Sequence, residues 1–298
     1  MRHLLGMEEL ERSDVEELLS RAAEHQRAMA EGRRGSSLAG KTVANLFFED
    51  STRTRTSFEF AARNLGADVL NWTSKGSSVS KGEALMDTVR NIEATGPAAL
   101  VIRHASSGAP HLAARYVKCA VINAGDGTHE HPSQALLDAF TLQEKLGSLE
   151  GKRILIVGDI LHSRVARSNL FCLKMLGAEV ILCGPPTLLP GGIEAAGVRV
   201  TYDLDSVIPE ADAVMMLRIQ LERQEDALFP SAREYSRLYG LSVARAAKLK
   251  PTAPVLHPGP MNRGVEIAPQ VADGPSSAIL EQVRNGVAVR MAILEACA

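Results

Sequence analysis

An apolar segment of the chain ends in a cluster of hydroxyl and guanidinium side chains at the start of a helix-like stretch. The cluster lies in FFEDSTRTRTSFE, residues 47–59, and its cations are Arg53 and Arg55. Its hydroxyls belong to Ser51, Thr52 and Thr54. A helix start adds backbone N–H groups and a positive dipole end. These groups predict a phosphate-binding site, with a Ser/Thr helix cap as the structural alternative. The pattern is not GxxxxGK[ST], so a nucleoside triphosphate is disfavoured.

A histidine and a glutamine form a second candidate group, at the entrance to the helix-like stretch PSQALLDAFTLQEKLG. His131 and Gln134 are three residues apart, so a helix puts both side chains on one face, and Pro132 suits its first turn. A capping or solvated histidine is the non-catalytic alternative. His129, two residues earlier, competes for the same role on the sequence alone.

Three more arginines stand where predicted strands end. Arg103 closes the apolar segment AALVIR, and Arg164 and Arg218 follow later apolar segments. Open α/β sheets bind their ligands at the carboxyl ends of parallel strands. Guanidinium forks suit carboxylates, so an arginine at such a position could contact an anionic ligand. A lone arginine at a strand end is otherwise more often a surface charge.

Short apolar runs alternate with helix-like stretches over most of the chain, which predicts parallel sheets covered by helices. The runs of the first half are TVANLFF, ADVLNW, AALVIR and AVINAG, and those of the second half begin at GKRILIVGD. We predict two doubly wound parallel-sheet α/β domains, residues 1–145 and 146–298, with the active site between them. The final stretch, about 279–298, reads as a long helix. The sequence does not decide on which domain that helix packs, and packing back on the first domain is one option.

The helix-like stretch near the amino terminus, SDVEELLSRAAEHQRAMA, has a candidate cap of its own. Ser13 is followed three residues later by Glu16, the spacing of a capping box. We therefore expect this helix to begin after Ser13.

The two predicted domains share one register. GKTVANLFFEDSTRTRTSFEFAARNLGADV and GKRILIVGDILHSRVARSNLFCLKMLGAEV align without a gap, and Arg53 falls opposite Arg164. Each arginine comes after the first strand of its half, at the start of the following helix. Helix amino termini at strand ends favour anions, so the register predicts two anion sites. Common packing needs are the alternative origin of this pattern.

Composition leaves a soluble globular protein with a real core. Of 298 residues 45% are hydrophobic and 23% charged, and the formal net charge is −2, so neither nucleic acid nor a membrane is expected as a partner. The amino terminus lacks the apolar stretch of a secretory signal. The four cysteines are widely spaced and are expected to be buried free thiols.

Four motifs resemble, in the same order, those of the aspartate and ornithine carbamoyltransferases. They are STRTR after an apolar strand, VIRH at 101–104, HPSQ at 131–134 and HPGP at 257–260. Together they cover nearly the whole chain. Glu49 resembles the aspartate enzymes, because ornithine enzymes usually carry lysine there, and HPGP departs from their HCLP. The resemblance therefore implies a cytoplasmic enzyme of de novo pyrimidine biosynthesis that carbamoylates L-aspartate.

The resemblance also implies roles for the first substrate, carbamoyl phosphate. Its phosphate is held by Ser51, Thr52, Arg53 and Thr54, and Arg103 reaches phosphate and carbonyl oxygens together. His131 donates to the carbamoyl oxygen, and the amide oxygen of Gln134 accepts from the carbamoyl NH₂. The tight turn Pro258, Gly259 and Pro260 approaches the carbamoyl group by its backbone, Pro258 offering its carbonyl. A plain turn is the alternative for this segment.

For L-aspartate the resemblance implies a second set of residues: Ser77, Lys81, Arg164, Arg218 and Gln220. Ser77 and Lys81 lie in the polar loop TSKGSSVSKGE, residues 73–83, which in this family reaches into the site of a neighbouring subunit. A homotrimer with shared sites follows from the resemblance. A solvated lysine loop is the alternative.

The implied mechanism is direct attack of the aspartate amine on the carbamoyl carbon, with Thr54, Arg103 and His131 stabilising the oxyanion. Arg53, Lys81 and Gln134 complete the catalytic set. No metal and no cofactor is expected, because the histidines show no HExxH pattern. Three alternatives remain: a carbamoyltransferase for ornithine or another amino acid, a Rossmann-type regulator or dehydrogenase lacking GxGxxG, and a non-catalytic anion-binding homologue. A regulatory chain or a partner enzyme of the pathway is possible, and no residue decides it.

Overall fold

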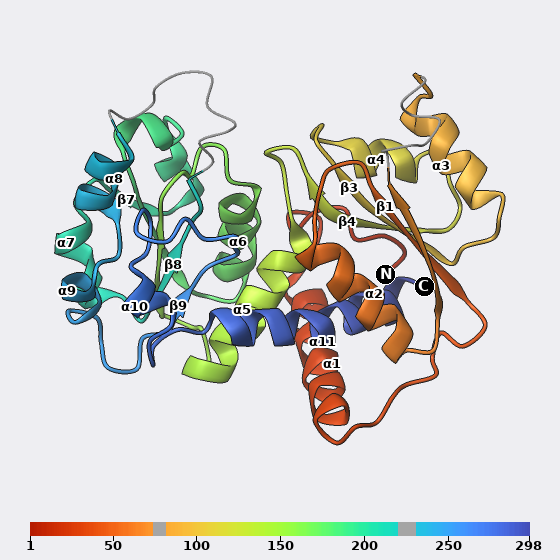
Figure 1. Cartoon of the computed structure of the whole chain (residues 1–298), viewed down its shortest axis with the longest axis horizontal. Helices are drawn as coiled ribbons and strands as arrows, with labels where there is room; N and C mark the ends of the chain where they lie inside the picture. Colours follow the sequence, from red (N-terminus) through yellow and green to blue (C-terminus); the bar gives the residue numbers. More distant parts are fainter. Residues whose placement is uncertain (74–81, 220–230) are drawn as a thin grey trace. The chain divides into compact units, whose positions relative to one another are not determined.

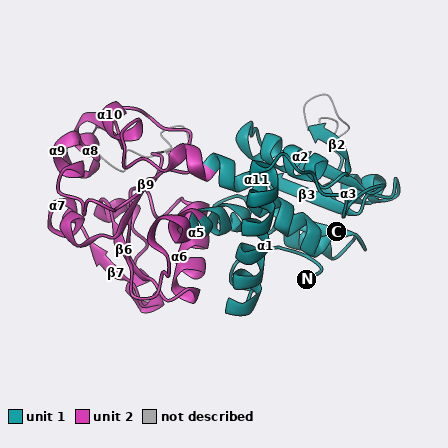
Figure 2. Cartoon of the chain, turned by 90° about the horizontal axis from the view of Figure 1, so that it is seen from below, with its two compact units in different colours: residues 1–140, 283–298 teal, residues 141–282 magenta. Residues whose placement is uncertain are grey.

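The computed structural model of the chain describes residues 1–73, 82–219 and 231–298. These residues form two compact units, shown in different colours in Figure 2. Unit 1 comprises residues 1–140 and 283–298, and unit 2 comprises residues 141–282. Each unit is built on one parallel sheet, which confirms the predicted fold class.

Unit 1 has a four-stranded sheet in the order β2-β1-β3-β4, and every neighbouring pair is parallel (Figure 1). Its strands are β1 (Thr42–Phe47), β2 (Asp68–Thr73), β3 (Ala99–His104) and β4 (Ala120–Asp126). Its helices are α1 (Arg12–Ala30), α2 (Arg53–Asn64), α3 (Leu85–Glu93), α4 (Ala109–Ala114), most of α5 (Pro132–Leu146) and most of α11 (Ile279–Cys297). The apolar runs of the sequence have become the strands.

Both faces of the unit 1 sheet are covered. Leu46, Leu100 and Ile102 pack with Val89 of α3 and Ala113 of α4 on one face. The alternating residues of β1, β3 and β4 are equally buried: Val43, Val101 and Ile122. Strands buried on both faces have nearly continuous apolar sequences, as β1, β3 and β4 do. β2 is an edge strand and is mostly exposed.

The first helix begins earlier than its sequence suggests. α1 starts at Arg12 with Glu11 as its N-cap, and the Glu11 N–H donates to Asp14 Oδ2 at 2.9 Å. The prediction of a cap at Ser13 is therefore wrong. Asp14, three residues after Glu11, takes the role toward Glu11 that Glu16 was expected to take toward Ser13.

The carboxyl-terminal residues belong to unit 1. Arg290 of α11 donates to Ser57 of α2, and Asn285 accepts from Gln26 of α1 at 2.9 Å. His25 of α1 lies 3.1 Å from Glu295. Residues 283–298 thus pack back on the first unit, the option that the sequence had left open.

Unit 2 has a five-stranded parallel sheet in the order β7-β6-β5-β8-β9. Its strands are β5 (Arg153–Val157), β6 (Glu179–Cys183), β7 (Arg199–Thr201), β8 (Ala213–Met216) and β9 (Val255–Leu256). Its α-helices are α6 (Arg164–Met175), α7 (Leu204–Val207), α8 (Ala232–Tyr239), α9 (Val243–Ala246) and α10 (Pro269–Ala272). Three short 3-10 turns are η2 (Pro186–Leu188), η3 (Ile193–Ala196) and η4 (Ile208–Glu210).

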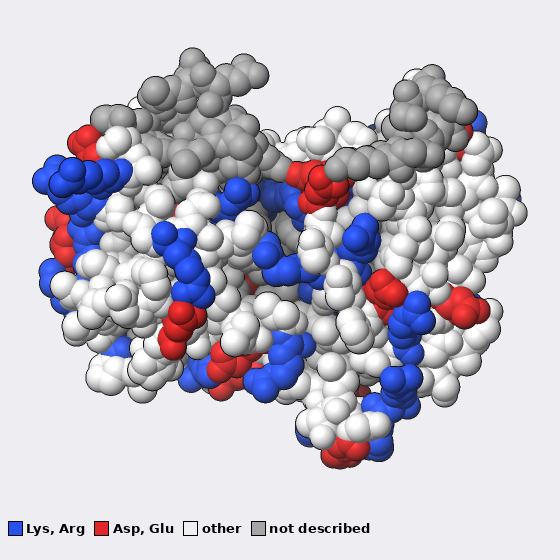
Figure 3. Space-filling view, viewed as in Figure 1, with Lys and Arg blue, Asp and Glu red and all other residues white. Residues whose placement is uncertain are grey.

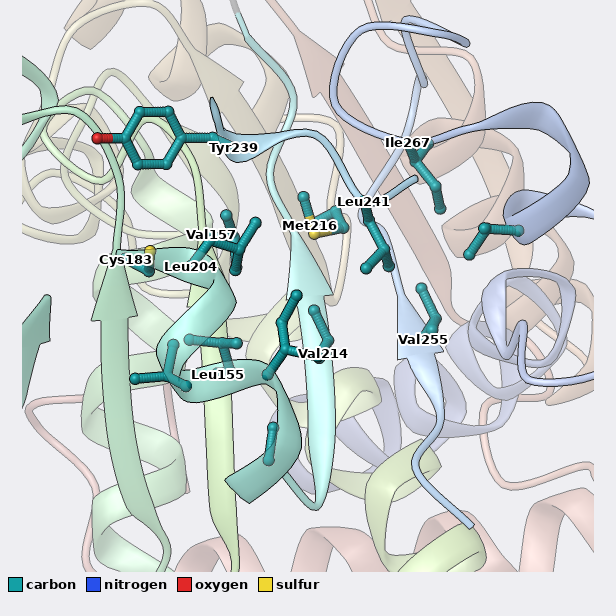
Figure 4. Close-up of a cluster of buried hydrophobic side chains, with 14 of the residues drawn as sticks. Leu155, Val157, Cys183, Leu204, Val214, Met216, Tyr239, Leu241, Val255 and Ile267 are labelled. Carbon is teal, nitrogen blue, oxygen red and sulfur yellow. The ribbon is translucent and has the colours of Figure 1, made fainter. Parts of the chain in front are cut away.

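One face of the unit 2 sheet packs into an apolar core, drawn in Figure 4. Leu155, Val157, Val214 and Met216 of the central strands meet Leu204 of α7 and other buried side chains there. Residues on the opposite face, such as Ile154 and Ile156, are also fully buried. The central strands are therefore a fixed base for the loops at their carboxyl ends.

The shared register of the two halves is visible in the structure. α2 and α6 each have twelve residues and begin with an arginine, Arg53 and Arg164. The glycines that frame the aligned segments, Gly40, Gly66, Gly151 and Gly177, all have positive φ. Both predicted arginines thus start the helix that follows the first strand of their unit, as the register predicts.

The distribution of surface charge and the burial of the cysteines are those of an ordinary globular protein. On the face drawn in Figure 3, acidic and basic side chains are intermixed. All four cysteines are free; Cys172 and Cys183 are buried, whereas Cys119 and Cys297 are half-buried. Burial raises the pKa of Cys183 to about 12. Among residues 1–73, 82–219 and 231–298, no helix is long and apolar enough to cross a membrane.

Candidate active site

The predicted site residues of unit 1 all lie at or after the carboxyl ends of its parallel strands. β2 lies on one side of the first strand and β3 on the other, so the chain reverses its winding between β1 and β3. Ligands of open α/β sheets bind at such a point, outside the carboxyl ends of the strands. Ser51, Thr52, Arg53 and Thr54 follow β1, Arg103 is the second-to-last residue of β3, and His131 and Gln134 follow β4. These residues all come from three neighbouring strands.

The turn after β1 leads directly into α2, as the phosphate-site prediction requires. Arg53 is its first residue and is exposed, whereas Thr54 is 7% exposed. The Thr52 side chain makes no capping hydrogen bond with the helix. The amino terminus of α2 therefore presents hydroxyls, backbone N–H groups and a guanidinium without a side-chain cap from Thr52, which suits a phosphate.

Arg103 is held beside this turn by the sheet. Its carbonyl accepts from the Phe48 N–H at 2.9 Å, and its Cα pairs in register with Phe47. Its Nε lies 3.3 Å from Glu49 Oε2 in a half-buried ion pair, and its Nη1 donates to the Ala124 carbonyl at 3.5 Å. Glu49, which the resemblance singled out, thus contacts a predicted catalytic arginine.

A buried aspartate organises the loop between β4 and α5. Asp126 Oδ2 accepts from the Gly108 N–H at 2.6 Å, and its Oδ1 accepts from the Glu130 N–H at 3.1 Å and from Asn123 Nδ2 at 2.8 Å. Three donors on one carboxylate fix the path of the backbone. The residue after Glu130 is His131, which is 4% exposed and precedes the first turn of α5.

The two candidate histidines of this loop have different surroundings. His129 Nδ1 lies 3.1 Å from Asp126 Oδ2, and its Nε2 lies 3.6 Å from Glu8 Oε1. His129 therefore contacts the amino-terminal segment and the loop aspartate. His131 is two residues closer in sequence than His129 to Gln134, which lies on α5 and is 7% exposed.

Unit 2 repeats the arrangement with other side chains. β6 and β7 lie on one side of β5 and β8 and β9 on the other, so its winding reverses between β5 and β8. Arg164 begins α6 after β5 and is 7% exposed, and Arg218 comes two residues after β8. The turn Pro258–Pro260 follows β9. The residues predicted for unit 2 thus also follow three neighbouring strands.

The turn between β5 and α6 is shaped by its own hydrogen bonds. Ser163 caps α6, its hydroxyl accepting from the Ala166 N–H at 3.1 Å. Asp159, 1% exposed, accepts from the His162 N–H at 3.1 Å. Gly158 has φ +136, and a Cβ there would lie 3.0 Å from Leu217 Cβ, so this position requires glycine.

A buried pair holds the turn after β9. His257 Nδ1 accepts from the Gly259 N–H at 2.8 Å, so the proton of a neutral ring lies on Nε2, 3.2 Å from Glu266 Oε1. Glu266 also accepts from the Asn262 N–H, and Asn262 Nδ2 donates to the Ile219 carbonyl at 2.9 Å. This network connects the turn with the residue after Arg218.

The sequence interpretation did not single out Asp126, Asp159 or Glu266, although each is buried and orients a loop at a strand end. Asp126 directly follows the apolar run AVINAG, and Asp159 is the last residue of the run GKRILIVGD. An aspartate at the end of a predicted strand was therefore a signal that the sequence offered. Glu266 gave none, because its partner His257 is brought to it by the fold. Ser77, Lys81 and Gln220 lie outside the described residues.

Comparison with known proteins identifies the family to which the chain belongs. Residues 2–144 match the family model described as aspartate/ornithine carbamoyltransferase, carbamoyl-P binding domain, and residues 150–297 match its Asp/Orn binding domain. The chain therefore belongs to the aspartate/ornithine carbamoyltransferase family and has the fold of these transferases.

Individual relatives are similar over the full length. A protein named aspartate carbamoyltransferase catalytic subunit from Myxococcus xanthus is 68% identical over 297 residues, covering 100% of this chain and 99% of that protein. One of the same name from Acidothermus cellulolyticus is 60% identical, covering 99% and 91%.

Solved structures agree. Aspartate transcarbamoylase from Trypanosoma cruzi in complex with carbamoyl phosphate has a TM-score of 0.90 at 32% identity, covering 99% of this chain and 96% of that one. Ornithine carbamoyltransferase from Thermus thermophilus has a TM-score of 0.87 at 26% identity, covering 99% and 98%.

Proposed function

We propose that this chain is an aspartate carbamoyltransferase. It transfers the carbamoyl group of carbamoyl phosphate to the amine of L-aspartate, giving N-carbamoyl-L-aspartate and phosphate. Relatives that carry this name at 68% and 60% identity support the choice of aspartate over ornithine. In this proposal the enzyme acts in the cytoplasm in de novo pyrimidine biosynthesis.

One observation carries the proposal: an arginine begins the helix at the winding reversal of each unit. Arg53 starts α2 and Arg164 starts α6. Carbamoyl phosphate and aspartate are both dianions of small size, and each needs a cationic site with oriented donors. A nicotinamide or nucleotide ligand would call for a glycine-rich turn at the same place, which neither unit has.

Unit 1 binds carbamoyl phosphate in this proposal. The phosphate oxygens take donors from Ser51, Thr52, Arg53 and Thr54, and Arg103 bridges phosphate and carbonyl oxygens. The ion pair between Arg103 Nε and Glu49 and the hydrogen bond from Nη1 to the Ala124 carbonyl orient the guanidinium. His131 and Gln134 recognise the carbamoyl oxygen and NH₂.

Unit 2 binds aspartate. Arg164 and Arg218 each offer a planar fork to a carboxylate, and Gln220 adds an amide. Pro258, Gly259 and Pro260 present backbone to the carbamoyl group, and His257 with Glu266 keeps that turn in shape. Ser77 and Lys81 complete the aspartate set as contributions of a neighbouring subunit.

The reaction needs no covalent intermediate. The neutral amine of aspartate attacks the carbamoyl carbon, and the carbonyl electrons move to its oxygen, where Thr54, Arg103 and His131 donate. Collapse of this tetrahedral species expels phosphate, which takes the amine proton. Loss of one oxyanion donor typically costs about 3–4 kcal/mol of barrier. The rest of the rate acceleration comes from holding the two anionic substrates close together in a reactive orientation.

An assay for carbamoyl aspartate tests the proposal directly. The purified chain is supplied with carbamoyl phosphate and either L-aspartate or L-ornithine, and the carbamoylated product is quantified. We expect product with aspartate only. Carbamoylation of ornithine, or no transfer to either amine, would overturn it.

The proposed assembly is a homotrimer with shared sites. Its mass in solution is measured by light scattering, and an Arg53→Ala variant is mixed with a Lys81→Ala variant after mild dissociation. If Lys81 serves a neighbour's site, mixed trimers contain sites with both native residues and regain activity. A monomeric mass, or no recovery on mixing, contradicts shared sites.

A further inference from the structure

The amide of Gln134 is oriented by a buried carboxylate one helical turn away. Gln134 Nε2 donates to Asp138 Oδ1 at 2.9 Å. Asp138 is 0% exposed, and both residues lie on α5, whose residues 132–140 are all buried. The spacing of four residues places the two side chains on the same face of the helix.

The chemistry of the pair fixes which end of the amide faces outward. A primary amide has one donor end and one acceptor end, whereas an ionised carboxylate only accepts. With Asp138 ionised, the NH₂ of Gln134 must point to it. The amide oxygen is then the atom left to meet another group, and it can only accept. A neutral neighbour able to donate would remove this constraint.

A buried arginine supports the ionised form of Asp138. Arg290 of α11 is 3% exposed, and its guanidinium is attracted by the Asp138 carboxylate. It donates to Ser57 Oγ at 3.0 Å, to Ser133 Oγ at 3.4 Å and to the Gly286 carbonyl at 3.1 Å. A buried carboxylate without a cation nearby tends to take a proton, and would then become a donor. A positive charge at Arg290 favours the ionised, acceptor-only form of Asp138.

We propose that Asp138, supported by Arg290, is a positioning residue that makes the Gln134 amide oxygen face the substrate and so selects an acyl phosphate bearing NH₂ over one bearing CH₃. The inference rests on the proposed function, in which Gln134 meets the carbamoyl NH₂. Acetyl phosphate has nearly the same shape as carbamoyl phosphate but presents a methyl group where the amine lies. An acceptor left facing a methyl loses its hydrogen bond, which disfavours the analogue.

The test compares the two acyl phosphates as ligands of intact enzyme. The dissociation constants of carbamoyl phosphate, acetyl phosphate and inorganic phosphate are measured for wild type and for Asp138→Asn. We expect wild type to prefer carbamoyl over acetyl phosphate by roughly tenfold or more. In Asp138→Asn the amide is free to rotate, so the preference falls to within about threefold, while inorganic phosphate binds as before. Lys145→Ala, an exposed change on the same helix, is the matched control.

A double-mutant cycle with Gln134→Ala shows whether Asp138→Asn acts through the orientation of Gln134 or by disturbing the site as a whole. Gln134→Ala should lose the same preference, and adding Asp138→Asn to it should change nothing further. An unchanged preference in Asp138→Asn, or equal weakening of all three ligands, overturns the positioning role. If Gln134→Ala keeps the wild-type preference, Gln134 does not meet the NH₂; the proposed function then still stands or falls on carbamoyl aspartate formation.

Variants of the arginine keep the proposal testable if Asp138→Asn does not fold. Arg290→Met removes the cation beside Asp138, and we expect it to lose the preference as Asp138→Asn does. Arg290→Lys keeps a cation there and should retain a larger preference than Arg290→Met. Equal preferences in the two variants would show that charge at this position does not act through Asp138.

Discussion

The turns after β1 and β5 have the same register and follow the same topology, yet they present their helix termini differently. The Thr52 side chain makes no capping hydrogen bond on α2, and Arg53 is exposed. Ser163 caps α6 through the Ala166 N–H, and Arg164 is buried. The first turn of α2 thus has no side-chain cap from the residue before its arginine, whereas the first turn of α6 gives one backbone donor to such a cap.

This difference matches what two kinds of anion need. A phosphate presents three oxygens and is satisfied by a ring of backbone and hydroxyl donors at a helix terminus. A carboxylate is planar and is satisfied by one guanidinium fork. In the proposed function, the same fold position therefore serves a phosphate in unit 1 and a carboxylate in unit 2.

The largest effect should come from removing the arginine of the first turn. We expect Arg53→Ala to lower kcat/KM for carbamoyl phosphate by about 10³-fold, because a donor to developing charge is lost. Steady-state assays with varied carbamoyl phosphate measure it. Arg63→Ala, at the exposed end of the same helix, should have little effect. Near-normal turnover of Arg53→Ala would refute the phosphate assignment.

Removing the arginine of the second turn should act on the other substrate. We expect Arg164→Ala to raise the KM for aspartate by roughly 10–100-fold, through loss of charge-assisted hydrogen bonds. Binding of carbamoyl phosphate should change little, which equilibrium titration can measure. Arg167→Ala, on an exposed position one turn along α6, is the control. If carbamoyl phosphate binding weakened as much as in Arg53→Ala, the two turns would not differ in ligand.

The caps themselves give a smaller but sharper contrast. Ser163→Ala removes a capping bond and should lower the free energy of unfolding by about 1 kcal/mol. Thr52→Ala removes none, so we expect a change within about 0.5 kcal/mol together with weaker carbamoyl phosphate binding. Urea unfolding of both variants, with hydrogen exchange in α2 and α6, measures the effect. Equal destabilisation by Ser163→Ala and Thr52→Ala would show that the first turns of α2 and α6 do not differ in capping.

The smallest effect concerns the strands after these helices. β2 is an exposed edge strand, whereas β6 is inner and carries Cys183, whose pKa burial raises to about 12. The unfolded thiol ionises near pH 9, so the stability from keeping this thiol neutral is complete below that pH and is lost as pH rises toward 12.

Unfolding at pH 8 and pH 10 therefore measures the contribution of Cys183. At pH 10 the loss should be about 1 kcal/mol, and Cys183→Ala should have a shallower pH slope than wild type by that amount. Parallel slopes in the two proteins would contradict a buried neutral thiol.

Local patterns predicted most of the fold. The apolar runs became β1, β3, β4 and the strands of unit 2, and the gapless register correctly paired Arg53 with Arg164. What the patterns could not show was position within a sheet. ADVLNW was predicted as a strand in the same way as TVANLFF and AALVIR, yet β2 lies at the edge and is largely exposed, because strand order depends on long-range crossovers.

The candidate site divides in the same way. Residues at strand ends, such as Arg103 and Arg218, could be proposed from the sequence, because they stand at the ends of predicted strands in motifs that resemble those of the family. The residues that orient them were not. Asp138 stands four residues after Gln134, a readable spacing, but its importance depends on Arg290, which comes from the other end of the chain. Glu266 likewise depends on its contact with His257.

The return of α11 to unit 1 has a consequence for how the protein is made. Arg290 lies beside the first turn of α5, but the ribosome adds it only after all of residues 141–282. A nascent chain that has just completed the β4–α5 region lacks the guanidinium that belongs next to Asp138. Unit 1 therefore cannot mature strictly in the order of synthesis, and the acyl-phosphate site that we propose in it should acquire its final selectivity among the last events of folding.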